Sequence, residues 1–257
     1  MTRGSTLCER LADGKPLFSS WASLPGRFHA DILARGDCDA VTIDMQHGAI
    51  GFSEAVALIG AVAQAGKPAV ARVPVGDMGM IGRLLDAGAE GLIVPMIETA
   101  AQAAACVEQA KYPPLGGRSW GAYLAISASG LSPAEYLLQA NSRVRLFVMI
   151  ETRRGLEALD EILAVPGIDG IFVGPTDLSI SLSKGASIDV FEPEPFAAAQ
   201  HIAARCAAAG LVAGIYAGSP EAARKMAGTG YRFITLGNDV TMFAAGIANA
   251  FRLARGV

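Results

Sequence analysis

Short runs of aliphatic residues recur along the chain, and each is followed by an alanine-rich stretch with helical spacing. The runs are bounded by glycine, proline or polar residues, a pattern that predicts strands. The predicted strands cover residues 16–22, 40–44, 69–73, 91–96, 145–150, 170–174, 212–217 and 233–237. The predicted helices between them cover residues 53–65, 78–87, 99–109, 153–163, 195–209 and 220–228.

Apolar strands that alternate with helices indicate a parallel sheet covered on both faces. Eight such units in 257 residues predict an α/β fold of the TIM (β/α)8 barrel type. An open doubly wound sheet is the alternative, but no GxGxxG motif follows the first predicted strand. Because no linker, repeat or low-complexity tail interrupts the pattern, we expect residues 1–257 to form a single domain. The long segments 111–132 and 178–194 are expected to serve the active site.

Composition narrows the classes of protein that the chain can belong to. Hydrophobic residues make up 52% of the sequence and the mean hydropathy is +0.38, yet no window offers the ~20 apolar residues of a membrane helix. Residues 1–13 lack a signal-peptide core, so we expect a cytoplasmic protein. The net charge of −3 gives no basic footprint for nucleic acid. The four cysteines are widely spaced without a CxxC pair, which disfavours a zinc site or a disulfide framework.

In a TIM barrel, polar residues at the carboxyl ends of the strands are the first candidates for catalysis. The second predicted strand ends in Asp44 and continues to His47, and the third carries Arg72. The fifth ends just before Glu151, and the sixth is followed by Asp177. The predicted topology therefore collects these ionisable groups on one rim.

Glu151 and Asp177 follow neighbouring strands. Such a pair of carboxylates can act as a general acid and base, or it can bind a divalent cation. Few protein carboxylates completed by waters suit Mg²⁺ or Mn²⁺. The alternative is an ion pair with Arg153 or Arg154.

His47 is one of three histidines, and it alone follows a predicted strand end, whereas His29 and His201 lie in predicted helices. Histidine is the side chain most often used as a general base. Asp44 could orient the His47 ring or cap the following turn. Arg72 is costly to bury unless it holds an anion, either a substrate carboxylate or enolate, or the carboxylate of Asp44 or Glu151.

The lysines bear on how a carbanion could be stabilised, because an imine-forming enzyme needs a lysine at the carboxyl end of a barrel strand. The lysines are Lys15, Lys67, Lys111, Lys184 and Lys225. They precede strands, lie in a helix, or fall in the two long segments. Carbanion chemistry in this chain would therefore depend on a metal ion.

From about Gly14 to Arg252 the chain resembles the class II pyruvate-dependent aldolases typified by 4-hydroxy-2-oxoheptanedioate aldolase, in the phosphoenolpyruvate/pyruvate superfamily with the citrate lyase beta family. The resemblance depends on several motifs whose order and spacing agree. They are residues 43–47 (IDMQH), 71–73 (ARV), 84–89 (LLDAGA), 94–96 (VPM), 150–152 (IET) and 174–179 (GPTDLS).

By this resemblance, Glu151 and Asp177 would bind a divalent cation such as Mg²⁺, Mn²⁺ or Co²⁺. Arg72 would steady the keto oxygen as it becomes an enolate, and His47 would be the base. Asp86 would raise the basicity of that histidine from a neighbouring subunit. The family is typically a hexamer built from swapped dimers, so we also expect a swapped C-terminal helix.

The resemblance also implies where the substrate binds. Asp44 matches the acidic residue before the histidine and joins His47, Arg72 and Asp86 as a catalytic candidate. The substrate-binding candidates are Trp21, Arg72, Gly174, Pro175, Thr176 and Asp177.

Several positions depart from the common family pattern. They are Met149, where glutamine is common, Gln46, where glutamate is common, and Ser119 and Trp120 in the loop 112–121. Since related chains of this kind are hydroxyketoacid aldolases, we expect pyruvate or hydroxypyruvate as the donor and an aldehyde as the acceptor. The alternatives are a citryl-CoA-type lyase of the same superfamily and a non-catalytic barrel that binds metal and oxo acids.

Overall fold

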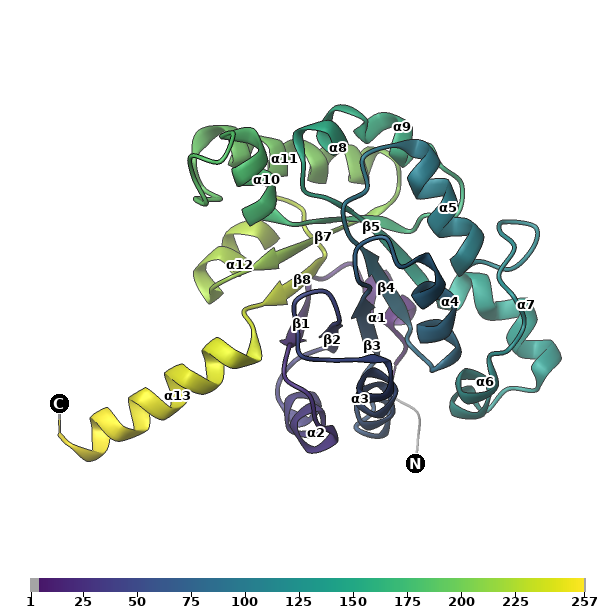
Figure 1. Ribbon diagram of the computed structural model, residues 1–257, viewed down its shortest axis with the longest axis horizontal. Coiled ribbons are helices and arrows are strands. Elements are labelled where there is room, and N and C mark those ends of the chain that lie inside the picture. Colours follow the sequence, from purple (N-terminus) through teal and green to yellow (C-terminus); the bar gives the residue numbers. More distant parts are fainter. Residues whose placement is uncertain (1–4, 257) are drawn as a thin grey trace.

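The computed structural model describes residues 5–256 and contains a closed barrel of parallel strands in the order β1 to β8, with β8 paired to β1 (Figure 1). The predicted TIM barrel is confirmed. The strands are β1 (Leu17–Ala22), β2 (Ala40–Asp44), β3 (Ala69–Arg72), β4 (Gly91–Val94), β5 (Arg145–Ile150), β6 (Gly170–Val173), β7 (Val212–Ala217) and β8 (Phe233–Leu236).

Helices surround the barrel, as Figure 1 shows. They are α1 (Leu7–Ala12), α2 (Arg27–Arg35), α3 (Phe52–Gln64), α4 (Met78–Asp86), α5 (Ala100–Ala110), α6 (Tyr123–Ser129), α7 (Pro133–Arg143), α8 (Arg153–Glu157), α9 (Leu159–Leu163), α10 (Pro175–Leu182), α11 (Pro193–Ala208), α12 (Pro220–Ala227) and α13 (Asp239–Ala254). Among the described residues, none of these helices is long and apolar enough to cross a membrane.

Side-chain caps fix several helix starts. The hydroxyls of Thr99 and Ser219 accept hydrogen bonds from the third residue that follows each, at the predicted starts of α5 and α12. The predicted helix over 153–163 is in fact two helices, α8 and α9, that meet at Ala158. The segments predicted as long loops contain α6 and most of α10, which begins at Pro175 in the favoured first helical position.

The interior of the barrel is filled by side chains. Phe147 and Phe233 stack with ring centroids 5.2 Å apart, and Phe172 packs edge-on against Phe233. Leu7 and Leu11 of α1 join the same buried cluster and close the amino-terminal end of the barrel. The opposite, carboxyl end remains available for a substrate.

Helix α13 extends away from the barrel (Figure 1). Asp239 is its buried residue, at its first position. Its exposed apolar side chains are Val240, Met242, Phe243, Ile247, Phe251 and Leu253. On α2, Phe28 and Ile32 are exposed as well. A helix with this much exposed apolar surface is typical of one that packs against another chain.

Candidate active site

One cavity of about 390 Å³ lies at the carboxyl ends of the barrel strands. The side chains that line it come from the ends of strands around the barrel and from the loops that follow them. The sequence-predicted residues that line it are Trp21, Asp44, His47, Arg72, Gly174, Pro175, Thr176 and Asp177. Long-range folding therefore brings most of the predicted site together.

Asp44 and Arg72 form a buried, two-pronged ion pair. Arg72 Nε donates to Asp44 Oδ1 at 2.9 Å, and Arg72 Nη2 donates to Asp44 Oδ2 at 2.8 Å. The two residues are register partners on neighbouring strands, and the guanidinium lies 4.7 Å from the Trp21 ring centroid. Of the two alternatives left open by the sequence, the partner of Arg72 in the protein is Asp44. This leaves Nη1 available for a ligand in the cavity.

Asp44 also fixes its surroundings. Its carboxylate accepts hydrogen bonds from Trp21 Nε1 at 3.2 Å and from the backbone N–H groups of Gln46 at 3.0 Å and His47 at 3.3 Å. Burial would raise the pKa of Asp44, but the Arg72 pair and these backbone bonds outweigh it and hold the pKa below its ordinary value. Asp44 is therefore an anion that organises the β2 end and leaves no oxygen free to orient the His47 ring.

His47 lies at the cavity edge, where its side chain is exposed to solvent. The backbone after it is tightly packed, because a Cβ on Gly48 would lie 2.2 Å from the Asp44 carbonyl oxygen and 2.9 Å from that of Ser23. Within residues 5–256 the His47 ring has no hydrogen-bond partner. An accessible imidazole on a fixed loop has the geometry of a general base.

Glu151 is buried directly behind the cavity, with 1% of its surface exposed. Its Oε1 accepts a hydrogen bond from the backbone N–H of Met96 at 2.8 Å. Burial raises the pKa of Glu151 to about 7; the charge of Asp177 adds to the rise, whereas the Met96 bond and Arg72 oppose it. A carboxyl group kept in such surroundings without an ion-pair partner is typical of a functional site. Neither Arg153 nor Arg154 pairs with it, since these contact Glu194 and Glu98.

Two backbone features fit the protein closely around Glu151. Met96 adopts a left-handed conformation, with φ of 58°, which costs a non-glycine residue about 1 kcal/mol. Gly174 lets the Glu151 carboxylate pack directly against the backbone, because a Cβ there would lie 2.4 Å from Glu151 Oε2 and 2.8 Å from Met149 Cε. The strained backbone of Met96 and the absence of a side chain at Gly174 both accommodate the Glu151 carboxylate. This indicates that the carboxylate is positioned to bind a ligand.

Asp177 lies in the first turn of α10, and its exposed carboxylate lines the cavity. The pair with Glu151 is suited to a hard divalent cation, which takes oxygen ligands and keeps several waters. Among residues 5–256 there is no cluster of three or more His, Cys, Asp or Glu side chains placed to hold a metal. A cation at the pair would thus complete its shell with water and substrate oxygens, as the sequence suggested for Mg²⁺ or Mn²⁺.

Asp86 is the one predicted catalytic residue that the fold places elsewhere. It ends α4, five residues before β4 begins, and so lies near the amino-terminal end of its own barrel. Its carboxylate accepts a hydrogen bond from Arg118 Nη2 at 2.6 Å. Because His47 follows the carboxyl end of β2, Asp86 can reach a histidine of this kind only in another copy of the chain.

Lys111 is the most buried lysine, but it has a structural partner. Its Nζ donates to Asp169 Oδ2 at 2.7 Å and to the Val144 carbonyl at 2.8 Å, and both of these residues immediately precede strands. It therefore lies at the opposite end of the barrel from the cavity. No lysine lines the cavity within the described part of the chain.

Several residues at or near the cavity were not predicted from the sequence, and three of them have polar side chains that matter below. Tyr216 at the end of β7 and Asn238 after β8 line it. Asp239 is buried beside it and accepts hydrogen bonds from the backbone N–H groups of Ser23 and Leu24 at 2.9 and 3.0 Å, with His29 Nε2 at 2.7 Å. The strand-end rule that found Asp44 would have found Tyr216 and Asn238 had it included neutral polar side chains.

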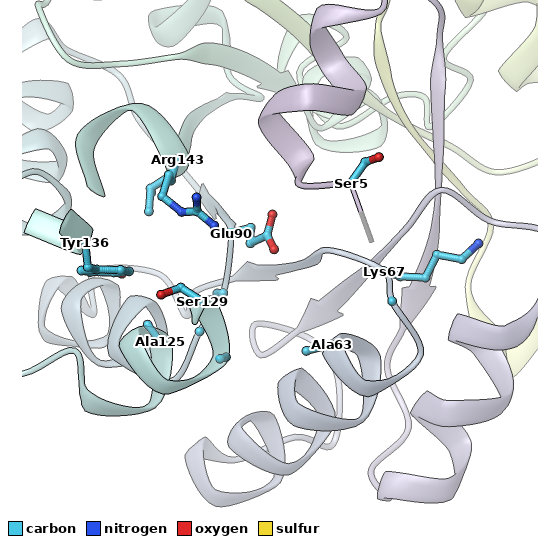
Figure 2. Close-up of a pocket in the computed structure, with 13 residues that line it drawn as sticks. Ser5, Ala63, Lys67, Glu90, Ala125, Ser129, Tyr136 and Arg143 are labelled. Carbon is cyan, nitrogen blue, oxygen red and sulfur yellow. The ribbon is translucent and has the colours of Figure 1, made fainter. Parts of the chain in front are cut away.

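A second, smaller pocket of about 80 Å³ lies where residues that precede β4 and β5 meet α3, α6 and α7. Figure 2 shows Glu90, Ser129, Tyr136 and Arg143 around it, with the Lys67 ammonium directed away from them. Glu90 and Val144 immediately precede strands, so this pocket is at the amino-terminal side of the barrel. Its volume and position exclude it as the site for a 2-oxo acid and an aldehyde together.

Comparison with known proteins gives a consistent result. Residues 20–245 match the family described as HpcH/HpaI aldolase/citrate lyase. A hydroxypyruvate/pyruvate aldolase of Rhizorhabdus wittichii is 40% identical over 95% of this chain and 96% of its own length. A 2-keto-3-deoxy-L-rhamnonate aldolase of Salmonella gallinarum is 34% identical over 97% and 92%. The crystal structure of an HpcH/HpaI aldolase/citrate lyase family protein from Burkholderia cenocepacia is 34% identical and has a TM-score of 0.86, over 97% of this chain and 98% of its own.

Proposed function

Because the chain belongs to the HpcH/HpaI aldolase/citrate lyase family, we propose that it is a divalent-metal-dependent aldolase. It adds the enolate of pyruvate or hydroxypyruvate to an aldehyde and gives a 4-hydroxy-2-oxo acid, in a reversible reaction. The observation that carries the proposal is the cavity in which Asp177, Arg72 and His47 converge, with Glu151 buried behind it.

Glu151 and Asp177 are the proposed metal ligands, and Mg²⁺, Mn²⁺ and Co²⁺ are the candidate ions. When bound, the cation would withdraw electron density from the keto oxygen of the 2-oxo acid and make its C3 protons easier to remove. Gly174 lets the Glu151 carboxylate pack against the backbone at the start of α10, the helix that carries Asp177. The backbone N–H of Thr176, in the first turn of α10, is the proposed donor to the substrate carboxylate, because a helix start favours an anion. Within residues 174–176 it is the N–H that remains, since the Gly174 N–H donates to the Ile150 carbonyl and Pro175 has none.

In this proposal His47 is the general base, and Arg72 stabilises the negative charge of the enolate. His47 takes one proton from C3, and the electron pair of that C–H bond moves to make the enolate, with charge on the C2 oxygen. Arg72 Nη1 stabilises that charge while Nε and Nη2 hold Asp44. C3 then bonds to the aldehyde carbon, and the former aldehyde oxygen takes up the proton that His47 holds, which makes the new hydroxyl group and returns the imidazole to its starting state. Cleavage is the reverse sequence.

We also propose that the active enzyme is an oligomer, with a hexamer of swapped dimers as the expected state. Helix α13 extends from the barrel with its apolar residues exposed, and a second copy could cover them. Asp86 lies at the amino-terminal side of the barrel and His47 at the carboxyl side, so in this proposal Asp86 acts on the histidine of a neighbouring subunit.

The proposal is tested by coupling pyruvate or hydroxypyruvate to glycolaldehyde and detecting the 4-hydroxy-2-oxo acid. We expect product from the metal-loaded enzyme, loss of product on chelation, and recovery with Mg²⁺, Mn²⁺ or Co²⁺. Borohydride added with pyruvate should not inactivate the enzyme, because no lysine lines the cavity within residues 5–256. Borohydride-trapped pyruvate on a lysine, or full activity in the chelated enzyme, would overturn the metal-dependent assignment.

A further inference from the structure

The side chains around the cavity divide into a charged side and a neutral side. His47 follows β2, Arg72 is the last residue of β3, and Asp177 lies in α10, which follows β6. The other side is made by the adjacent strands β7, β8 and β1, and we call it the neutral arc: Trp21, Ser23, Tyr216, Asn238 and Thr241. If the 2-oxo acid occupies the charged side, as proposed above, the neutral arc is where the aldehyde must lie.

Asn238 has a fixed orientation because it caps α13. Its Oδ1 accepts a hydrogen bond from the backbone N–H of Thr241 at 2.8 Å. Its amide NH₂ group is therefore the part of the side chain that remains for another partner, and Tyr216 lines the same cavity. An amide NH₂ group only donates, so Asn238 does not take up the proton of the Tyr216 hydroxyl.

Tyr216 keeps its proton at neutral pH. Burial raises the pKa of Tyr216 above its ordinary value, and the Asn238 amide opposes this rise only in part. The Tyr216 O–H therefore remains free to donate to a ligand in the cavity that it lines.

Packing holds the Tyr216 ring in place. It lies edge-on to Trp21, with ring centroids 5.3 Å apart and an interplanar angle of 78°. Trp21 is in turn fixed by its hydrogen bond to Asp44 at 3.2 Å. A donor held in this way discriminates between ligands better than one that can turn to water.

The neutral arc has no cation to pair with a charged acceptor. Among the described residues that line the cavity, the arginine is Arg72, which is bound to Asp44, and there is no lysine. A phosphate or carboxylate on the aldehyde would normally be met by Arg or Lys. Hydroxyl and amide groups beside two aromatic rings suit an uncharged, hydroxylated molecule instead.

We propose that Tyr216 determines acceptor specificity by donating a hydrogen bond to the hydroxyl group of an uncharged 2-hydroxyaldehyde. This inference rests on the proposed aldolase function. It selects glycolaldehyde over propanal, two aldehydes with the same number of non-hydrogen atoms that differ by a hydroxyl in place of a methyl group. A site built to bond a hydroxyl group rejects the analogue without one, because its own polar group is then left unpaired.

The test is the ratio of kcat/KM for glycolaldehyde to that for propanal, with pyruvate as donor, in the intact metal-loaded enzyme. We expect Tyr216→Phe to lower this ratio by about tenfold, the scale of one lost hydrogen bond. Asn238→Asp keeps the helix cap but turns the Tyr216 proton toward the new carboxylate, so it should lower the ratio similarly. Tyr123→Phe, on the exposed helix α6, is the matched control and should leave the ratio unchanged.

Each rate is compared with deuterium exchange at C3 of pyruvate, measured on the same preparation without aldehyde. Wild-type enzyme with neither exchange nor addition would contradict the aldolase function itself. Exchange and addition with an unaltered aldehyde ratio in Tyr216→Phe would overturn the role of Tyr216 alone. A wild-type preference for succinic semialdehyde, which carries a carboxylate, would overturn the neutral arc as the acceptor site.

Discussion

Replacement of Arg72 by lysine is expected to lower kcat by at least ~100-fold, the usual effect of losing one donor to a developing oxyanion. Arg72 uses two of its nitrogens for Asp44 and has Nη1 left for the enolate oxygen. Lysine carries the same charge, but its ammonium cannot serve both partners in this planar geometry. Steady-state kinetics with pyruvate and glycolaldehyde measure the loss.

Substitutions of Arg72 should also destabilise the protein, because its partner Asp44 is buried. Arg72→Ala would leave its carboxylate without an ionic partner, at a cost of ~3 kcal/mol or more in unfolding free energy. Arg72→Lys should cost less, since a positive charge remains. Arg153→Lys, whose ion pair with Glu194 is partly exposed at 2.9 Å, is the control and should change neither quantity much. Normal kcat in Arg72→Lys with a large drop in Tm would show that Arg72 is structural only.

Glu151→Gln is expected to abolish metal-dependent activity and yet stabilise the metal-free protein at high pH. The pKa of Glu151 is about 7 in the folded chain, above its ordinary value of 4.5. The folded state therefore binds the proton more tightly than the unfolded state. Stability from this group is fully present below about pH 4.5 and is lost as pH rises through 7. The loss amounts to about 3 kcal/mol at pH 8 and above.

Glutamine has no proton to lose, so the metal-free variant should escape this decline. Urea denaturation in the presence of chelator, from pH 5 to 9, should show the variant gaining on the wild type as pH increases. Glu194→Gln, an exposed carboxylate on α11, should run parallel to the wild type. If the Glu151→Gln and wild-type curves also run parallel, the carboxyl group does not titrate in this range and its isolation in the fold has no energetic consequence.

The barrel was predictable because buried parallel strands have short, continuous aliphatic sequences, and here helices separate them. The residues at which strands end were harder to predict. The fourth strand was predicted to reach Met96 but ends at Val94, since Pro95 has no N–H for the ladder and Met96 turns to donate to Glu151. The start of helix α10 was missed because residues 174–177 were interpreted as a polar motif in the loop after a strand.

The charged residues of the candidate site were predictable from the sequence. Asp44, His47, Arg72, Glu151 and Asp177 were found because ionisable groups contrast with the apolar strands they end. The pairing of Asp44 with Arg72 was only one of two alternatives, since it depends on the register between β2 and β3, which neither strand encodes alone. The neutral side chains of Tyr216 and Asn238 do not stand out from the strands in this way. The orientation of the Asn238 side chain depends on its role as the N-cap of α13.

Deuterium exchange at C3 of pyruvate, followed by NMR without any aldehyde, isolates enolate formation at this cavity. The metal-loaded wild type should exchange readily, the chelated enzyme should fall to the buffer rate, and added Mn²⁺ should restore exchange. His47→Ala loaded with metal should exchange ~100-fold more slowly, as expected for a lost general base. His201→Ala, on the exposed face of α11, should match the wild type. Undiminished exchange in the chelated enzyme would contradict metal-dependent enolate formation, and undiminished exchange in His47→Ala would exclude His47 as the base.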